Sequence, residues 1–332
     1  MTITIADISS KTGALLKQAF YSEGGVVKTP LLHSPALSEL SGCNLYLKCE
    51  NLQTTGSFKI RGATSAILNL PAGEKEVVTA SSGNHGAATA TAAKAHGISV
   101  SIYVPEAINE VKENKIISAG ATLVKIPGPG DNAEAEAARV AAERELSYIS
   151  PYNHADIVAG QGTLGAEILD QLPEVNAIFA SVGGGGLISG IGCHLHTHKP
   201  GTEIVGCWPG NSTAMLQCMR AGKVIEVSEE DTLSDGTAGG VEQGSLTLNL
   251  CEDVISSTTT VSEWEIARAM ALVHQHHDFI VEGAAGVALA GLLQNPDAYK
   301  GRNVVIVLCG QNIATEKFEF AMDLAASENP NS

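Results

Sequence analysis

The stretch SVGGGG, residues 181 to 186, decides how this chain folds. Four consecutive glycines follow the apolar run AIFASV and precede LISGIGCHLHTHKPG, which predicts a helix ended by Pro200 and Gly201. The order is therefore a strand, a glycine loop and the N-terminus of a helix. Glycines leave backbone N–H groups accessible, and a helix N-terminus adds unpaired donors and partial positive charge. Such a loop predicts a binding site for a phosphate group.

Two other interpretations of the glycine loop are a flexible turn and a dinucleotide-binding loop. Flexible loops usually mix Ser, Asn and Asp among their glycines, and this loop has none of them. A G-x-G-x-x-G frame that begins at Gly183 meets Ile188, one that begins at Gly184 meets Ser189, and no P-loop lysine follows. The loop therefore favours a single phosphate on a ligand smaller than a dinucleotide.

The composition is that of a globular protein of about two domains or lobes. The chain has 332 residues, of which 44% are hydrophobic and 17% charged, and its formal net charge is -16. Since 36 acidic side chains outnumber 20 basic ones, we expect neither nucleic acid nor an anionic membrane as a partner. The N-terminal residues lack a basic leader followed by an apolar block, so a cytoplasmic location is expected.

The cysteines and histidines do not indicate a metal site or a disulfide framework. The seven cysteines are odd in number and form no C-x-x-C pair. Two histidine clusters, HLHTH at 194–198 and HQHH at 274–277, fall near the ends of predicted helices, where a cation is favourable. We therefore expect surface histidines, with a metal site as the alternative.

Strand-like and helical segments alternate along most of the chain. Strands are predicted at 44–49, 76–80, 98–104, 122–126, 177–182, 203–208 and 303–309, and helices from Ser57, from about Asn84, near 108–118 and from Asp131. This rhythm predicts an α/β protein with mostly parallel sheets, whose ligands bind at the carboxyl ends of the strands.

One lysine begins a predicted helix in TTGSFKIRGA. A helix N-terminus disfavours a cation, so Lys59 either points to solvent or has a role that tolerates a lowered pKa. A lysine that forms a Schiff base needs that lowering, because its neutral amine is the nucleophile. The stretch alone does not decide between the two.

Two further motifs also lie where a strand ends. SSGNHG at 81–86 offers hydroxyls, an amide and free N–H groups at one helix start, which predicts a carboxylate site, although a simple helix cap is the alternative. VLCGQN at 307–312 ends a strand predicted to be buried, and by itself it indicates a turn with a core thiol at Cys309.

Together these motifs resemble the fold type II pyridoxal 5'-phosphate enzymes, in particular the serine/threonine dehydratase and serine racemase family. The resemblance runs from TPLL at 29–32 to CGQN at 309–312 and includes AGQGT at 159–163, SDG at 234–236 and VEGAAG at 281–286. It implies a two-lobed, tryptophan synthase β-like α/β fold with helices on both faces of mostly parallel sheets. A large cofactor-binding domain would comprise residues 1–70 and 150–325, a small domain of residues 71–149 would close over the substrate, and residues 326–332 would be a disordered tail. A homodimer is the family expectation.

The resemblance also assigns roles to residues. Lys59 would bind the cofactor as an internal aldimine and later move the Cα proton, and Ser82 matches the residue that racemases use as acid and base on the opposite face. The other expected cofactor contacts are Phe58, Asn84, Gly183, Gly184, Gly185, Gly186, Leu187, Gly236 and Cys309. The substrate carboxylate would be held by Ser81, Ser82, Asn84 and His85. Cys309 stands where relatives place a serine opposite the pyridine nitrogen, so that nitrogen should stay unprotonated, which favours prompt β-elimination.

The implied reaction is dehydration of a 3-hydroxy amino acid to a 2-oxo acid and ammonia. L-Threonine, L-serine and bulkier substrates such as phenylserine remain open, and the racemase activity and a binding protein with little turnover are the alternatives. Glu134 and Glu136 stand near where relatives that bind dicarboxylates offer an arginine, which disfavours hydroxyaspartate. Trp208 and Ala214 stand where metal-dependent relatives carry a Glu and an Asp, so we expect no divalent metal there.

Overall fold

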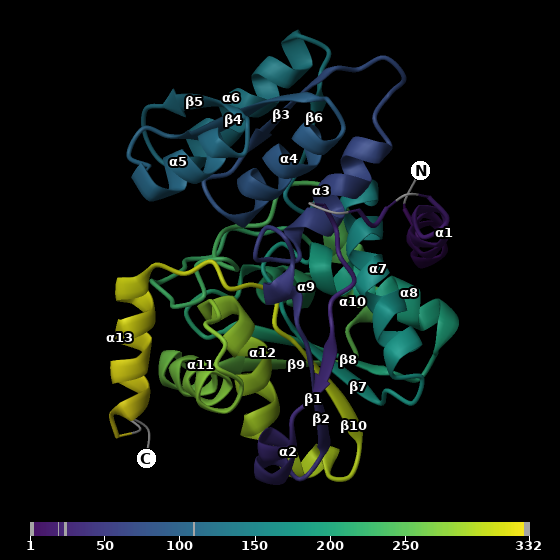
Figure 1. The fold of residues 1–332 in the computed structure, drawn as a ribbon, viewed down its shortest axis with the longest axis vertical. Helices are drawn as coiled ribbons and strands as arrows, with labels where there is room; N and C mark the ends of the chain where they lie inside the picture. Colours follow the sequence, from purple (N-terminus) through teal and green to yellow (C-terminus); the bar gives the residue numbers. More distant parts are fainter. Residues whose placement is uncertain (1–2, 19, 23–24, 109, 329–332) are drawn as a thin grey trace.

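The computed structural model describes residues 3–18, 20–22, 25–108 and 110–328, and these form two sheets with surrounding helices. Figure 1 shows the smaller sheet above and the larger sheet below. Residues 76–148, in the first half of the chain and coloured blue to teal, build the sheet of the upper part, and the chain then returns to the lower part. Segments from both ends of the sequence therefore meet in the larger sheet.

The larger sheet has strand order β1-β2-β10-β7-β8-β9. Its strands are β1 Leu31–His33, β2 Asn44–Lys48, β7 Ala177–Ser181, β8 Glu203–Pro209, β9 Ser257–Val261 and β10 Asn303–Val307. All neighbouring strands pair in parallel except β1, which is antiparallel to β2. Every residue of the central strand β7 is buried, as expected for a parallel strand covered on both faces. The glycine loop leaves the carboxyl end of this strand.

Helices cover both faces of the larger sheet, as the fold class predicted. Figure 1 shows α12 and α11 to one side of it, with α13 outside them, and α7 and α8 to the other, with α1 and α10 nearby. Their bounds are α1 Ile5–Leu15, α7 Ala155–Gln171, α8 Gly186–His198, α10 Leu246–Val254, α11 Glu263–His277, α12 Gly283–Gln294 and α13 Thr315–Ala326. Shorter elements are α2 Pro35–Ser41, α9 Ala214–Ala221, and the 3-10 helices η1 Glu50–Leu52 and η2 Pro296–Tyr299.

The smaller sheet has strand order β5-β4-β3-β6, all in parallel. Its strands are β3 Glu76–Ala80, β4 Ser99–Pro105, β5 Thr122–Ile126 and β6 Ser147–Tyr148, and its helices are α4 Asn84–Ala95, α5 Glu110–Ser118 and α6 Gly130–Glu143. Helix α3, Lys59–Leu68, packs against both α4 and α7 and so lies between the two sheets. The strands of this sheet fall inside residues 71–149, while the proposed domain boundaries themselves stay a prediction.

Several expected elements differ from the structure. Helix α3 begins at Lys59 instead of Ser57, because Ser57 forms a β-bridge with Gly310. Strand β9, with the sequence STTTV, was not predicted, because this edge strand is polar and its pattern lacks an apolar face. Helix α13 includes Ala326, the first residue of the expected disordered tail, whereas residues 329–332 lie outside the described part of the chain.

The expectation of surface histidines is wrong for His194. This side chain is buried and stacks on His198 with ring centroids 4.1 Å apart. Helix α8 approaches α7 at Gly165, where an added Cβ would lie 3.5 Å from the His194 Cβ. Burial lowers the pKa of His194 to about 4, so the ring is neutral at physiological pH. No group of three or more His, Cys, Asp or Glu residues that could hold a metal ion occurs among the described residues.

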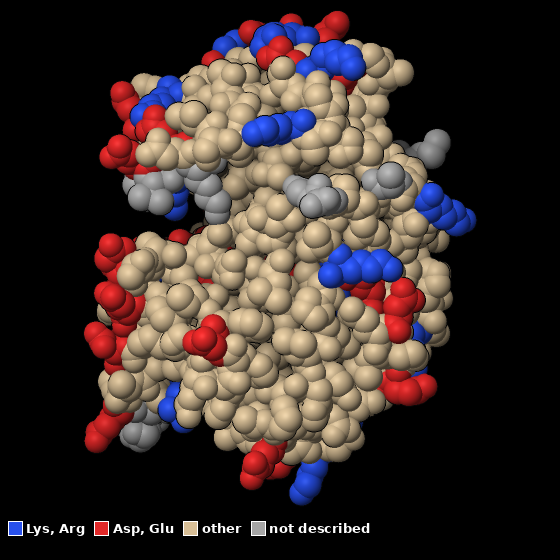
Figure 2. Space-filling model, viewed as in Figure 1, with Lys and Arg blue, Asp and Glu red and all other residues tan. Residues whose placement is uncertain are grey.

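The acidic composition is visible on the surface. Figure 2 shows Asp and Glu side chains along the edge of the lower part that carries α13. This distribution opposes binding of polyanions at that edge. None of the described helices is long and apolar enough to cross a membrane.

Candidate active site

The glycine loop forms a row of free backbone donors. Helix α8 begins at Gly186, and its N-cap Gly185 has a φ of 81° and offers no side-chain cap. Among the described residues, the N–H groups from Gly183 to Ile188 have no hydrogen-bond acceptor. Thr247 Oγ1 donates to the Gly184 carbonyl at 2.6 Å and Cys251 Sγ to the Gly185 carbonyl at 3.8 Å, which anchors the carbonyl side of the loop. The loop is therefore suited to hold an anion such as phosphate.

The same loop needs glycines for a second reason, which is close packing. A Cβ on Gly184 would lie 2.4 Å from the ring of Tyr152, and one on Gly183 would lie 2.8 Å from the Thr237 carbonyl oxygen. A Cβ on Gly185 would lie 2.6 Å from Cys251 Sγ. Real Cβ atoms do not approach neighbours this closely, so each of these positions excludes a side chain.

Lys59, the first residue of α3, has the properties of a nucleophilic amine. Its Nζ donates to the Pro151 carbonyl at 2.9 Å and lies 5.3 Å from the centroid of the Phe58 ring. Burial lowers the pKa of Lys59 to about 8, and the nearby Glu282 carboxylate opposes that shift. Pro151 directly precedes Tyr152, so the lysine and the glycine loop contact the same short segment of chain.

A hydrogen-bonded chain of side chains crosses the site from one sheet to the other. Asn312 Nδ2 donates to Asn84 Oδ1 at 2.7 Å, and Asn84 Nδ2 donates to Glu282 Oε2 at 2.9 Å. A carboxylate only accepts, so the orientation of the Asn84 amide follows from its partners. Burial raises the pKa of Glu282 to about 7, with the hydrogen bond from Asn84 opposing the rise. Asn84 begins α4 of the smaller sheet, while Glu282 is the N-cap of α12.

The helix start at α4 offers donors for a carboxylate, but one expected side chain points elsewhere. Gly83 gives no side-chain cap, and Ser82 is half-buried with its hydroxyl unbonded among the described residues. Ser81 Oγ accepts from the N–H of Gly83 at 3.2 Å. The His85 imidazole is buried and its Nε2 lies 2.9 Å from the Ile149 carbonyl oxygen. Burial lowers its pKa to about 3, with Lys59 adding to the effect, so the ring is neutral.

Cys309 is buried two residues beyond the end of β10. Its Sγ accepts from Ser181 Oγ at 3.7 Å and donates to Glu282 Oε1 at 3.7 Å. Burial raises the pKa of the Cys309 thiol, and the charge of Glu282 adds to the rise, so the thiol is uncharged. The Cys309 carbonyl accepts from the N–H of Phe58 at 3.0 Å and links β10 to the start of α3. Gly236, another residue expected to contact the cofactor, is exposed and lies near Glu282. A Cβ added to Gly236 would lie 3.7 Å from Glu282 Oε1.

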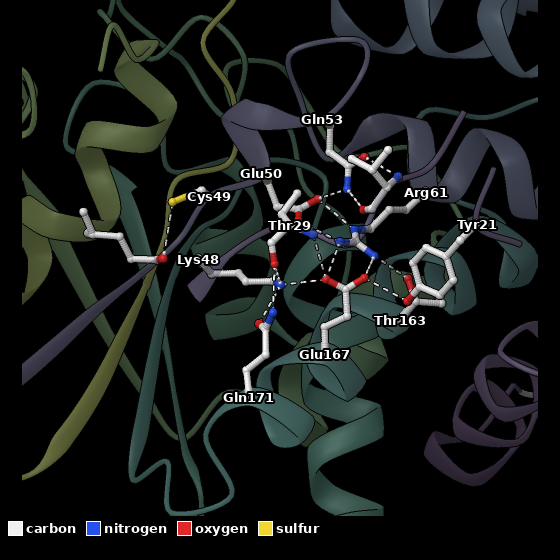
Figure 3. Close-up of polar contacts among 12 residues, drawn as sticks. Tyr21, Thr29, Lys48, Cys49, Glu50, Gln53, Arg61, Thr163, Glu167 and Gln171 are labelled. Atoms are coloured by element: carbon white, nitrogen blue, oxygen red, sulfur yellow. Dashed lines mark hydrogen bonds and ion pairs between the residues drawn. The ribbon is translucent and has the colours of Figure 1, made fainter. Parts of the chain in front are cut away.

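A buried ion cluster surrounds Arg61, which lies two residues after Lys59 in α3 (Figure 3). Arg61 is fully buried and pairs with Glu50 at 2.7 Å and with Glu167 at 2.7 Å, while Lys48 pairs with Glu167 at 2.6 Å. Burial alone would lower the pKa of Arg61, but the two carboxylates raise it instead. The four charges sum to zero, and Tyr21, Thr29, Gln53, Thr163 and Gln171 supply further hydrogen bonds. The cluster joins α3 to η1, β2 and α7, and so fixes the helix that carries Lys59.

Sequence reasoning did not assign roles to two residues of this site. Glu282 lies within the quoted motif VEGAAG, and its signal was a carboxylate placed between apolar residues. Tyr152 had no recognisable signal, since it lies on the connection from the smaller sheet to the larger one.

Trp208 is buried with its ring 2.6 Å from where a Cβ on Gly206 would lie, and Ala214 begins α9. Neither of the latter two can ligate a metal ion.

Known proteins resemble this chain over most of its length. A family model described as pyridoxal-phosphate dependent enzyme matches residues 23–310. The L-threonine ammonia-lyase of Thermotoga maritima is 37% identical over 87% of this chain and 72% of its own. The serine racemase of Arabidopsis thaliana is 36% identical over 86% of this chain and 88% of its own. The processed form of threonine deaminase isoform 2 from Solanum lycopersicum has a TM-score of 0.91 and 29% identity, with 98% of this chain and 95% of that chain covered. The chain belongs to the pyridoxal-phosphate dependent enzymes of fold type II, in the group of serine/threonine dehydratases and serine racemases.

Proposed function

We propose that this protein is an ammonia-lyase that dehydrates a 3-hydroxy amino acid, with L-threonine and L-serine as first candidates, to a 2-oxo acid and ammonia. The observation that carries the proposal is the Lys59 amine, whose pKa is lowered to about 8 and which contacts the segment that packs on the glycine loop. Relatives that carry the names dehydratase or ammonia-lyase support the reaction class.

The residues present fit pyridoxal 5'-phosphate. The free N–H groups from Gly183 to Ile188 match a phosphate, and Leu187 lies in this row. Lys59 offers an amine that is largely neutral above pH 8, which is the form that attacks an aldehyde. Asn84 offers an oriented amide N–H, Phe58 an apolar ring and Cys309 an uncharged thiol. We assign these residues, together with Gly236, to the cofactor.

When bound, the cofactor supplies an electron sink for the electrons left at the substrate Cα. In the proposed reaction, Lys59 removes the Cα proton, and its lowered pKa keeps a usable fraction of the amine neutral near pH 8. The N–H groups at the start of α4, together with Ser81 and Ser82, hold the substrate carboxylate through hydrogen bonds and the helix dipole. His85 contributes its backbone N–H in this assignment, because its imidazole is engaged with Ile149.

Racemisation of serine is the second candidate. The observation that favours it is the Ser82 hydroxyl, which is half-buried and unbonded among the described residues. A free hydroxyl beside the substrate can exchange a proton with Cα on the face opposite Lys59. The resemblance to a serine racemase supports this candidate, but by the family resemblance dehydratases carry the same serine, so Ser82 does not distinguish the two activities.

The test is 2-oxo acid release by the purified protein with added pyridoxal 5'-phosphate, measured across L-threonine, L-serine, L-threo-phenylserine and 3-hydroxyaspartate. Release from wild type that is lost in Lys59→Ala and kept in Lys125→Ala, an exposed lysine paired with Glu113, supports the lyase. An absence of release, combined with inversion of L-serine seen by chiral analysis, would replace it with the racemase. We further propose that the enzyme needs no divalent cation and is a cytoplasmic homodimer; these remain predictions from the sequence.

A further inference from the structure

The segment Ser150–Asn153 contacts both parts of the proposed cofactor site. It follows β6 and returns the chain from the smaller sheet to the larger one. The Pro151 carbonyl accepts from Lys59 Nζ at 2.9 Å, and the Tyr152 ring fills the space where a Cβ on Gly184 would lie, 2.4 Å from it. Whatever fixes this segment therefore fixes the lysine relative to the phosphate loop.

A single loop residue, Glu242, makes three hydrogen bonds to this segment. Glu242 Oε2 accepts from Asn153 Nδ2 at 2.8 Å, and Oε1 accepts from Ser150 Oγ at 3.5 Å. The N–H of Glu242 donates to the Tyr152 hydroxyl at 2.8 Å. Among the described residues the carboxylate has no ion-pair partner, so its charge is stabilised by these neutral donors.

The contact continues into helix α10. Asn153 Oδ1 accepts from the N–H of Leu246, the first residue of α10, at 2.9 Å. Thr247 and Cys251 lie one turn apart on this helix. Their side chains donate hydrogen bonds to the carbonyls of Gly184 and Gly185. The amide nitrogen of Asn153 is thus held by Glu242. Its amide oxygen binds the first residue of α10 and so orients the helix behind the glycine loop.

We propose that Glu242 is a positioning residue that, through Asn153, Ser150 and Tyr152, holds Lys59 and the glycine loop in register for the cofactor. The inference rests on the proposed function, because it assigns the cofactor to this loop and this lysine. It predicts that the Glu242–Asn153 pair controls cofactor affinity although neither side chain belongs to the set assigned to the cofactor.

The test uses a donor–acceptor exchange. Asn153→Asp faces Glu242 with a second carboxylate and should weaken pyridoxal 5'-phosphate binding by about tenfold. Glu242→Gln replaces the charged acceptor with a neutral amide oxygen, so it should weaken binding by a smaller factor. In the double variant Asn153→Asp/Glu242→Gln, the new amide donates to the new carboxylate, which still accepts from the N–H of Leu246. Affinity and the absorbance band of the lysine-bound cofactor should return toward wild type. Gln243→Ala, at an exposed neighbour, is the matched control.

Hydrogen exchange separates the possible results. The N–H groups of Asn153, Glu242 and Leu246 should exchange faster in both single variants and recover in the double variant. Wild-type affinity in both single variants would overturn the proposal, as would a double variant weaker than either single one. If wild type itself formed no lysine-bound band, the proposed function would be wrong, whereas the exchange data would still report whether Glu242 holds the segment.

Discussion

Asn84 Nδ2 lies 2.9 Å from Glu282 Oε2, and this hydrogen bond joins helix α4 of the smaller sheet to helix α12 of the larger one. The carboxylate is buried, and its pKa is raised to about 7. The link is therefore between a neutral amide and a carboxyl group that changes charge near physiological pH. Because Lys59 lies close enough to feel that charge, the protonation of Glu282 also affects the lysine.

Glu282→Gln should change how stability depends on pH. The ordinary pKa of the carboxyl is 4.5 and its folded value is about 7, so wild type loses stability as pH rises through that window. The variant lacks this titration, so its stability relative to wild type should improve by on the order of 3 kcal/mol between pH 4.5 and pH 8. Urea unfolding of the cofactor-free protein at several pH values measures the difference. A parallel pair of curves for wild type and Glu282→Gln would contradict the assignment.

The attachment of pyridoxal 5'-phosphate to Lys59 should titrate near pH 8. Only the neutral amine reacts, so the attachment rate in cofactor-free protein should rise about tenfold per pH unit below 8 and level off above it. Stopped-flow measurement of the absorbance band of the lysine-bound cofactor gives this rate directly. Since Glu282 raises the lysine pKa, Glu282→Gln should move the midpoint to lower pH. A midpoint near the ordinary lysine value of 10.5 would show that the amine is not desolvated.

Gly184→Ala should destabilise the protein by about 1–3 kcal/mol, because the new Cβ would lie 2.4 Å from the Tyr152 ring. Cofactor retention on a desalting column should fall with it, since the ring must move to make room. Gly210→Ala is the matched control, because its Cβ would meet only the Val261 carbonyl oxygen at 3.5 Å. Equal unfolding midpoints for the two variants would argue against the close approach.

Arg61→Lys should cost about 3–5 kcal/mol of unfolding free energy, although it keeps the charge. The guanidinium makes paired hydrogen bonds to both Glu50 and Glu167, and an ammonium group cannot reproduce them in a site with no access to water. Arg139→Lys, at an exposed arginine paired with Glu136, should have a much smaller effect on stability, because water screens that pair. Denaturant unfolding compares the two, and a small effect at Arg61 would mean that the cluster relaxes around a shorter side chain.

Removal of divalent cations should leave 2-oxo acid release unchanged. By the family resemblance, Trp208 and Ala214 stand where metal-dependent relatives carry a Glu and an Asp, and neither side chain can ligate a divalent cation. Activity assayed in a chelator, and again with Mg²⁺ or Ca²⁺ restored, checks this directly. Strict dependence on either ion would show that other residues bind a metal.

The sequence was most informative where a strand ends at a chemically unusual group. Strand β3 was predicted at 76–80, the bounds it has in the structure, and helix α4, predicted from about Asn84, begins at that residue, because an apolar run of strand length gives way to a helix start. The sequence predicted that the glycine loop offers backbone N–H donors. It did not predict that close packing also requires glycines there, because Tyr152 and Thr237 are distant in sequence and contact the loop only in the folded chain. For His85 the sequence predicted the place at the helix start but not the direction of the side chain. The imidazole points to Ile149, and sequence alone does not determine that rotamer.

The residues that link the two sheets could not be predicted in principle from local pattern. Glu242 and Asn153 are separated by a long stretch of chain and stand in polar loops, where neither periodicity nor spacing marks a partner. Glu282 was part of a recognised motif, but its raised pKa depends on burial, which follows from the packing of α12 against the larger sheet.

All cysteines of the chain are buried, and each belongs to a segment outside residues 71–149: Cys43, Cys49, Cys193, Cys207, Cys218, Cys251 and Cys309. A thiol reagent therefore does not report unfolding of the smaller sheet, and it reacts only when unfolding of the larger part of the molecule exposes a cysteine. Pulsed alkylation followed by mass spectrometry would time the unfolding of one half of the molecule without any engineered label, and protection of Cys309 by the cofactor would appear in the same experiment.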